Sequence, residues 1–104
     1  MTLAILLEDE FGEREDGFVD VGYLLPIIET SFGGTEERER LLDYIDPWGH
    51  TVFNRLQLDR LSAELDELRK IGLNDKELKI INQFQDLIAK CKKTVHTYIK
   101  ITGD

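Results

Sequence analysis

His50 is the residue of this chain best suited to proton transfer, because it closely follows two carboxylates, Asp43 and Asp46. A histidine held beside a carboxylate can act as a general acid or base near neutral pH. The second histidine, His96, is distant in sequence and would approach His50 only if the strands around them pair. A turn histidine more often makes an ordinary hydrogen bond or faces water. An enzyme that uses His50 with nearby carboxylates is therefore the third-ranked hypothesis, and we predict a non-catalytic protein that needs no cofactor.

Carboxylates are concentrated between positions 8 and 16, where they could bind a metal ion or attract a cation. An EF-hand calcium loop needs oxygen ligands at alternating positions, a glycine at the sixth and a glutamate at the twelfth. Asp9, Phe11 and Glu13 do not supply that order, so we predict no metal site. We expect instead a loop in which the carboxylates face water while Phe11 and Phe18 turn inward.

The negative charge of the chain lies in its first half. Residues 1–46 contain 13 acidic and 3 basic side chains, a net charge of −10, whereas residues 47–104 contain 8 acidic and 10 basic side chains, a net charge of +2. A field of this sign opposes binding to nucleic acid or to an anionic membrane. It favours a basic protein partner, which complementary charge would steer into contact. Solubility alone is the alternative explanation of the acidity.

Length and composition fit a single domain that spans residues 1–104. The chain is 41% hydrophobic and 33% charged, as globular proteins of this size commonly are. No apolar run approaches the roughly 20 residues that span a bilayer, and the apolar start lacks the basic region of a signal peptide. The single cysteine, Cys91, permits no internal disulfide. We therefore expect a cytoplasmic protein.

A tight turn around Trp48 is expected to organise the fold. Asp46 and Pro47 suit the first two positions of a type I turn, and strand-forming residues stand before it at 41–46 and after it at 51–53. We therefore predict a β-hairpin. The sequence leaves two interpretations of Trp48 open: its ring folds back onto the core, or it is an exposed anchor for a partner.

Apolar periodicity predicts two long helices, 54–71 and 75–92. Asn54 and Asn74 each have Gln or Glu three residues later, as in a capping box, and Gly72 suits the end of the first helix. The buried stripe of the first helix is expected to comprise Leu56, Leu61, Leu65 and Leu68, with Leu58 and Ile71 flanking it and Glu64 facing out. The stripe of the second comprises Leu78, Ile81, Phe84, Ile88 and Cys91.

The remaining elements are a shorter helix and two strands. The helix is expected over residues 20–29, capped by Asp20 and ended at residues 33–34, with Pro26 kinking it or moving its start toward Tyr23. The apolar run 2–7 predicts a buried central strand. Alternation predicts a C-terminal strand whose inward residues are Val95, Thr97, Ile99 and Ile101. Together these elements predict an α+β fold of three to four mostly antiparallel strands against two long helices and one shorter helix, in the order β-α-β-β-α-α-β.

The fourteen residues from Tyr44 to Gln57 resemble a segment of small, acidic, mostly uncharacterised bacterial proteins. Some of these proteins are similar to the immunity proteins encoded beside secreted toxins. The resemblance implies a cytosolic binding protein that blocks the active site or substrate face of a basic, nuclease-type toxin domain. The second-ranked hypothesis is a non-catalytic interaction module or a subunit of a larger assembly, which an exposed apolar stripe on either long helix would favour.

The predicted partner-binding surface combines the acidic run with the turn. Its carboxylates would pair with the Lys and Arg side chains that a nuclease toxin uses to bind phosphates. Trp48 would supply an apolar anchor if the turn lies alongside. The predicted surface comprises Glu8, Asp9, Glu10, Glu13, Glu15, Asp16, Asp43, Asp46 and Trp48.

Overall fold

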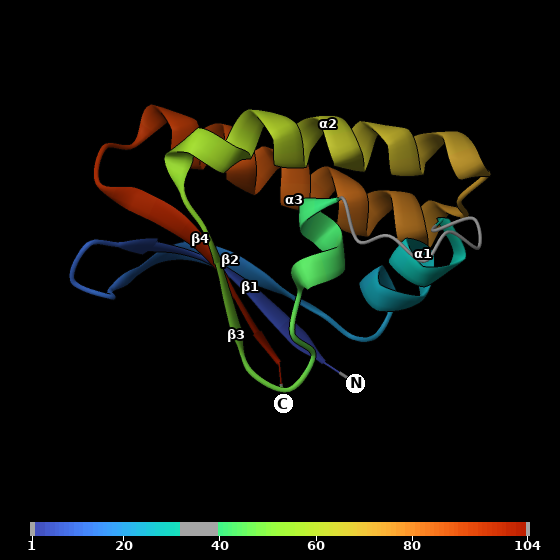
Figure 1. Cartoon of the computed structure of the whole chain (residues 1–104), viewed down its shortest axis with the longest axis horizontal. Helices are drawn as coiled ribbons and strands as arrows, with labels where there is room; N and C mark the ends of the chain where they lie inside the picture. Colours follow the sequence, from blue (N-terminus) through green and yellow to red (C-terminus); the bar gives the residue numbers. More distant parts are fainter. Residues whose placement is uncertain (1, 32–39, 104) are drawn as a thin grey trace.

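The computed structural model describes residues 2–31 and 40–103. These residues form an α+β fold in which a four-stranded antiparallel sheet packs against helices on one side (Figure 1). The predicted fold class, the antiparallel sheet, the two long helices and the shorter one are confirmed. The elements, with η for 3-10 helices, are β1 (Leu3–Asp9), β2 (Arg14–Asp20), α1 (Leu24–Ser31), η1 (Leu41–Tyr44), β3 (His50–Phe53), η2 (Arg55–Gln57), α2 (Leu58–Leu68), η3 (Arg69–Ile71), α3 (Asp75–Lys93) and β4 (Thr97–Gly103).

The sheet has the strand order β2-β1-β4-β3, so that β1 and β4 are its central strands. The prediction of a buried central strand at the start of the chain is confirmed, since every second residue of β1 from Leu3 to Leu7 is at most 1% exposed. In β4, Thr97, Ile99 and Ile101 are buried as predicted. Val95 is 70% exposed instead, because α3 runs to Lys93 and a turn precedes the strand.

The acidic run is a β-hairpin rather than the loop that the sequence predicted. The carboxylate of Asp9 accepts hydrogen bonds from the backbone N–H groups of Phe11 and Glu13, each at 2.9 Å, and Gly12 has a φ of 79°. This closed turn lets β2 pair antiparallel with β1. Because β2 is an edge strand, the charged side chains of Arg14, Glu15 and Asp16 stay exposed to water, and pairing outweighs their low strand propensity. Phe18 packs on the core as predicted, whereas the inward prediction for Phe11 is wrong, because this side chain is 82% exposed.

The turn around Trp48 forms, but the hairpin predicted around it does not. The backbone N–H of Trp48 donates to a carboxylate oxygen of Asp46 at 2.9 Å. The segment before the turn is the 3-10 helix η1, because the carboxylate of Glu64 accepts hydrogen bonds from the N–H groups of Leu41 and Leu42 at 2.9 and 3.0 Å. The strand after the turn, β3, pairs with β4. The order is therefore β-β-α-β-α-α-β, with the second strand supplied by the acidic run.

Helix α1 begins at Leu24, so Pro26 lies in the first turn, where its missing N–H needs no partner. The carboxylate of Asp20 accepts hydrogen bonds from the N–H groups of Tyr23 and Leu24, at 2.9 and 3.0 Å. The alternative in which Pro26 moves the start of the helix toward Tyr23 is thus confirmed. Asp20 binds N–H groups at that start, but it lies four residues before Leu24 and is not the N-cap residue that the sequence predicted. The end predicted at residues 33–34 lies outside the described residues.

The two long helices follow the prediction closely. Both capping boxes are present, at Asn54 and Asn74, and Gly72 ends the first helical segment with a φ of 79°. The buried leucines predicted at 61, 65 and 68 are confirmed, but Leu56 is 93% exposed. The prediction that Glu64 faces water is wrong as well. Its side chain is 11% exposed, and its carboxylate accepts a hydrogen bond from the backbone of η1. Among the described residues, no helix is long and apolar enough to cross a bilayer.

Replacing Glu64 with alanine should lower the free energy of unfolding by about 1–3 kcal/mol, because two part-buried N–H donors of η1 would lose their acceptor. The control is Glu67→Ala in the same helix, where the side chain is 71% exposed and only pairs with Lys70; it should change stability by less than about 0.5 kcal/mol. Urea denaturation of the two variants makes the comparison. Equal effects would contradict the role assigned to Glu64.

Candidate partner-binding site

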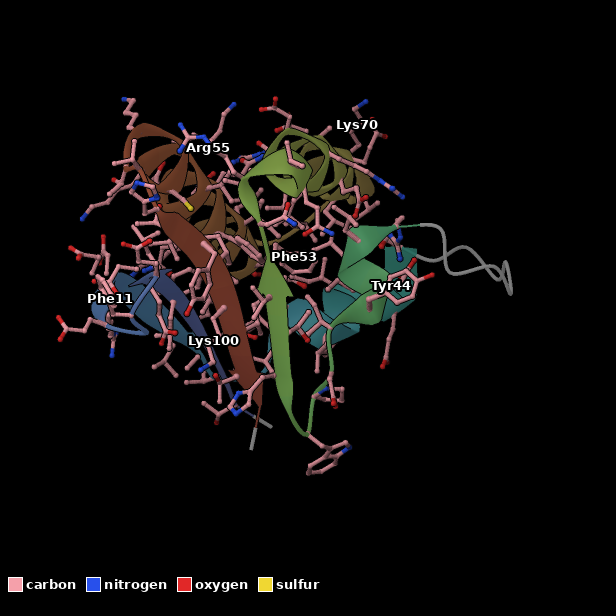
Figure 2. The ribbon with its side chains drawn as sticks, turned by 60° about the vertical axis from the view of Figure 1, so that its left-hand side comes forward. Phe11, Tyr44, Phe53, Arg55, Lys70 and Lys100 are labelled. Atoms are coloured by element: carbon pink, nitrogen blue, oxygen red, sulfur yellow. The ribbon has the colours of Figure 1, made fainter. Side chains whose placement is uncertain are left out.

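The turn between β1 and β2 presents an aromatic ring among carboxylates. Figure 2 shows Phe11 at the opposite side of the molecule from Tyr44. The Phe11 side chain is 82% exposed, and its neighbours Glu10 and Glu13 are exposed as well. The Asp9 side chain fixes the turn through its two backbone contacts, and the N–H of Gly12 donates to the Asp9 carbonyl at 3.0 Å. The ring is thus held in water by an ordered turn rather than by a hydrophobic contact.

Glu8, the first residue of the acidic run, is part of the sheet and not of its exposed surface. Its side chain is 9% exposed. The Tyr98 hydroxyl donates a hydrogen bond to its carboxylate at 3.2 Å, and the Lys100 ammonium lies 3.7 Å away. Burial, and then the hydrogen bond to Glu8, raises the pKa of Tyr98 above its usual value. Glu8 therefore has a role in the fold and is unsuited to pairing with a partner.

Two further members of the acidic run have partners within the chain. Asp16 accepts hydrogen bonds from the N–H of Gly17 at 2.8 Å and from the Lys90 ammonium at 3.0 Å. These contacts, with the backbone bond first, hold the pKa of Asp16 below its usual value. Glu10 lies 3.7 Å from the ring of His96, and both groups are largely exposed. Within four residues of Phe11 in the sequence, the hairpin also exposes the glutamates Glu10, Glu13 and Glu15.

The Trp48 turn lies at the other end of the sheet, so the predicted surface is divided in two. His50 pairs with Thr102, which pairs with Ala4 at the start of β1, whereas the acidic turn follows the end of that strand. Trp48 is 74% exposed, which rules out the interpretation that its ring is part of the core. Asp46 caps this turn, and Asp43 forms an ion pair with Arg40 at 2.8 Å while its side chain is 5% exposed.

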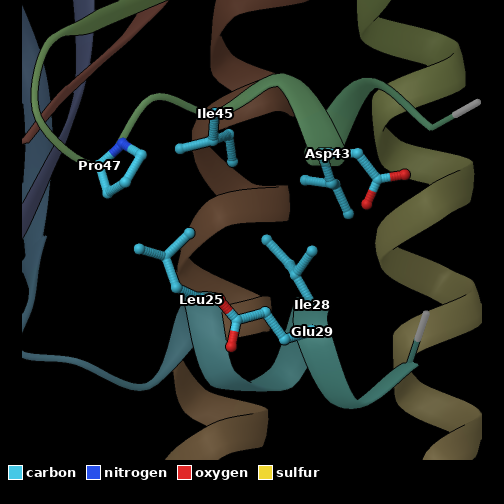
Figure 3. Close-up of a pocket in the computed structure, with 7 residues that line it drawn as sticks. Leu25, Ile28, Glu29, Asp43, Ile45 and Pro47 are labelled. Carbon is cyan, nitrogen blue, oxygen red and sulfur yellow. The ribbon is translucent and has the colours of Figure 1, made fainter. Parts of the chain in front are cut away.

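A hollow of about 330 Å³ lies between α1 and the η1 segment. In Figure 3, Leu25 and Ile28 from α1 face Ile45 across it. Asp43 is the only member of the predicted surface that lines this hollow. An adjoining hollow of about 280 Å³ shares Leu25, Glu29 and Pro47 with it. No histidine lines either hollow, so neither cavity places an imidazole where a bound substrate would meet it.

The histidines occupy separate places on the surface. The strands around them do pair, but His50 faces Thr102 near one end of β4 while His96 precedes the other end. The His50 ring has the Thr102 hydroxyl as its hydrogen-bonding partner, at 3.1 Å. Among the described residues, the carboxylate of Glu10 lies beside His96, and no carboxylate is paired with His50. The arrangement therefore lends no support to a catalytic pair of His50 with Asp43 or Asp46.

Within residues 2–31 and 40–103, no group of three or more His, Cys, Asp or Glu side chains is placed to hold a metal ion. No known family, curated protein or solved structure matches the chain. The two exposed ends of the sheet, at Phe11 and at Trp48, are the candidate contact surfaces.

Proposed function

We propose that this chain is a non-catalytic binding protein whose acidic hairpin engages a basic protein domain, in the way an immunity protein engages a toxin. The observation that carries the proposal is the exposed Phe11 ring in the turn of a hairpin that also exposes Glu10, Glu13 and Glu15. An exposed aromatic side chain is a common anchor of protein interfaces. A hairpin whose turn is already hydrogen-bonded loses little conformational freedom on binding. The proposal narrows the predicted surface to this end of the sheet.

The expected mechanism is occlusion of the partner's functional face. The carboxylates attract the partner's Lys and Arg side chains and speed encounter. Phe11 then enters an apolar recess between those cations and slows dissociation. A basic domain that binds phosphates, such as a nuclease toxin, combines both features, and a hairpin seated there would block its substrate.

The proposal predicts that the acidic hairpin controls the rate of association. The variant Glu10→Gln/Glu13→Gln/Glu15→Gln should bind the product of the adjacent gene more slowly than the wild type, by roughly tenfold at low salt, because steering by exposed charge would be lost. Asp16 is left intact because it pairs with Lys90 of α3. The matched control, Glu67→Gln/Asp75→Asn/Asp86→Asn, removes the same charge from α2 and α3. Surface plasmon resonance measures both rates.

A further inference from the structure

The two adjoining hollows between α1 and the η1 segment form a concave apolar surface that the proposed function does not use. Their volumes are about 330 and 280 Å³, and they share Leu25, Glu29 and Pro47. Ile28 and Ile45 add to the apolar wall of the larger hollow (Figure 3). Sites for small molecules are concave, mostly apolar and roughly 300–1,000 Å³ in volume. The size and the lining of these hollows therefore suit a small molecule.

Polar contacts fix the two sides of the hollows relative to each other. The guanidinium of Arg40, the residue before η1, donates hydrogen bonds to the carbonyl of Ile28 at 3.0 Å and to the hydroxyl of Ser31 at 2.7 Å, both in α1. It also pairs with Asp43 of η1 at 2.8 Å. The carboxylate of Glu64 in α2 binds the backbone of η1 as well. A ligand would thus meet walls that are already in place, which lowers the cost of binding.

One carboxylate, that of Glu29, sets the charge that the hollows offer to a ligand. Two other acidic residues line them and are engaged within the chain: Asp43 pairs with Arg40, and Asp20 accepts hydrogen bonds from backbone N–H groups at the start of α1. Glu29 is exposed, and among the described residues its carboxylate has neither a hydrogen bond nor an ion pair. No lysine, arginine or histidine is among the described residues that line either hollow. The hollows consequently combine an apolar wall with a negative charge.

We propose that the two hollows bind a small apolar amine. The hydrocarbon body of the ligand lies against Leu25, Ile28 and Ile45, and its ammonium group pairs with the carboxylate of Glu29. Charge complementarity selects this class, because an anionic ligand would face Glu29 and a chain whose net charge is −8. A lysine side chain of a partner protein fits less well, since its four-carbon stem would leave most of the apolar wall uncovered. The inference does not rest on the proposed function, because no residue of the turn between β1 and β2 lines either hollow.

The octylammonium ion is the probe for this inference, because it joins a hydrocarbon chain to a single cation that stays protonated at neutral pH, as the lysine ammonium does. Burial of one methylene group strengthens binding by up to about fourfold. Octylammonium should therefore bind at least about tenfold more tightly than butylammonium, which has the stem length of lysine. Octanol has the same chain without the charge and should bind roughly threefold more weakly than octylammonium, as expected from the loss of an exposed ion pair. Octanoate should bind more weakly still.

Titration of the intact, isotope-labelled chain, followed by two-dimensional NMR, tests the inference. In about 0.15 M salt, which screens exposed carboxylates elsewhere, octylammonium should shift the amide signals of α1 and of residues 42–47. The shifts should saturate with a Kd on the order of 1 mM, as expected for a ligand of this size. The amide signals of the turn between β1 and β2 should stay unchanged.

Two variants examine the ion pair with Glu29. Glu29→Gln should lower the affinity for octylammonium roughly threefold and leave the affinity for octanol unchanged, because only the ion pair is lost. A purely structural role of Glu29 would change both affinities equally. The matched control Asp86→Asn removes an exposed carboxylate of α3 that lines neither hollow, and it should bind both probes as the wild type does. Equal octylammonium affinities of the two variants would contradict the proposed pairing.

Three results with the wild-type chain would also overturn the inference, whether or not Glu29→Gln folds. The first is the absence of saturable shifts in α1 and residues 42–47 at up to about 10 mM octylammonium, or shifts spread over exposed carboxylates throughout the chain. The second is equal affinity for octylammonium and octanol, because the hollows would then not select a cation. The third is equal affinity for butylammonium and octylammonium, which would show that the hollows need no more than a lysine side chain supplies.

Discussion

Replacing Leu65 with alanine should lower the free energy of unfolding by roughly 2–5 kcal/mol, whereas Leu56→Ala should change it by less than about 0.5 kcal/mol. Both leucines belong to the same helical segment, but Leu65 is 0% exposed and Leu56 is 93% exposed. Truncating the first leaves a cavity between α2 and its neighbours, while truncating the second removes contacts only with water. Urea denaturation followed by circular dichroism measures both. Equal losses would contradict the helix orientation described above.

The two leucines also show what the sequence could predict about the helices. The stripe at 61, 65 and 68 follows the spacing of an α-helix, and the structure buries all three residues. Leu56 lies in η2, whose tighter 3-10 turn places it off the α-helical stripe. The capping residue Asn74 marked the start of α3 correctly, whereas Asn54 caps η2, the 3-10 turn before α2. Both capping boxes were accessible from the sequence because a cap is a local interaction within four residues.

Replacing Phe11 with alanine should raise the dissociation rate from the basic partner by at least about 30-fold, which corresponds to about 2 kcal/mol. The stability of the free chain should stay unchanged, since the side chain is 82% exposed. The matched control is Trp48→Ala, because Trp48 is an aromatic residue with 74% exposure at the opposite end of the sheet. Its dissociation rate should equal that of the wild type.

The Phe11 and Trp48 comparison determines which end of the molecule binds. A faster dissociation for Trp48→Ala, with Phe11→Ala unaffected, would move the interface to the turn beside η1 and contradict the proposed hairpin site. Surface plasmon resonance with both variants gives the rates. Circular dichroism confirms that each variant is folded before its kinetics are compared.

Sequence reasoning identified the acidic run but not its hairpin. Strand signals there are weak, because charged residues fill β2, and its pairing with β1 is a tertiary interaction. A local signal was present nonetheless: Asp9 and Gly12 are turn-forming residues that follow an apolar strand. Recognising that turn would have placed Phe11 at an exposed tip. The pairing of β3 with β4 was harder to predict from the sequence, because it joins residues about 50 positions apart.

The 3-10 helix η1 and the division of the predicted surface both result from contacts between residues that are distant in the sequence. Residues 41–46 were predicted as a strand, but the carboxylate of Glu64, distant in sequence, accepts hydrogen bonds from the N–H groups of Leu41 and Leu42. Local propensity could not reveal that acceptor. Whether Asp46 and Trp48 lie beside the acidic run depended on the direction and register in which β3 pairs with β4 and β4 with β1, which no local pattern specifies.

The association rate of the Glu10→Gln/Glu13→Gln/Glu15→Gln variant, measured at about 50 mM and about 300 mM salt, tests the central claim most directly. The account predicts a rate roughly tenfold below the wild type at low salt, a smaller difference at high salt, and a weaker salt dependence. The control that neutralises three helix carboxylates should retain most of the wild-type rate and salt dependence. Association rates that do not differ between the hairpin variant and the wild type, at both salt concentrations, would contradict the claim that the hairpin steers a basic partner.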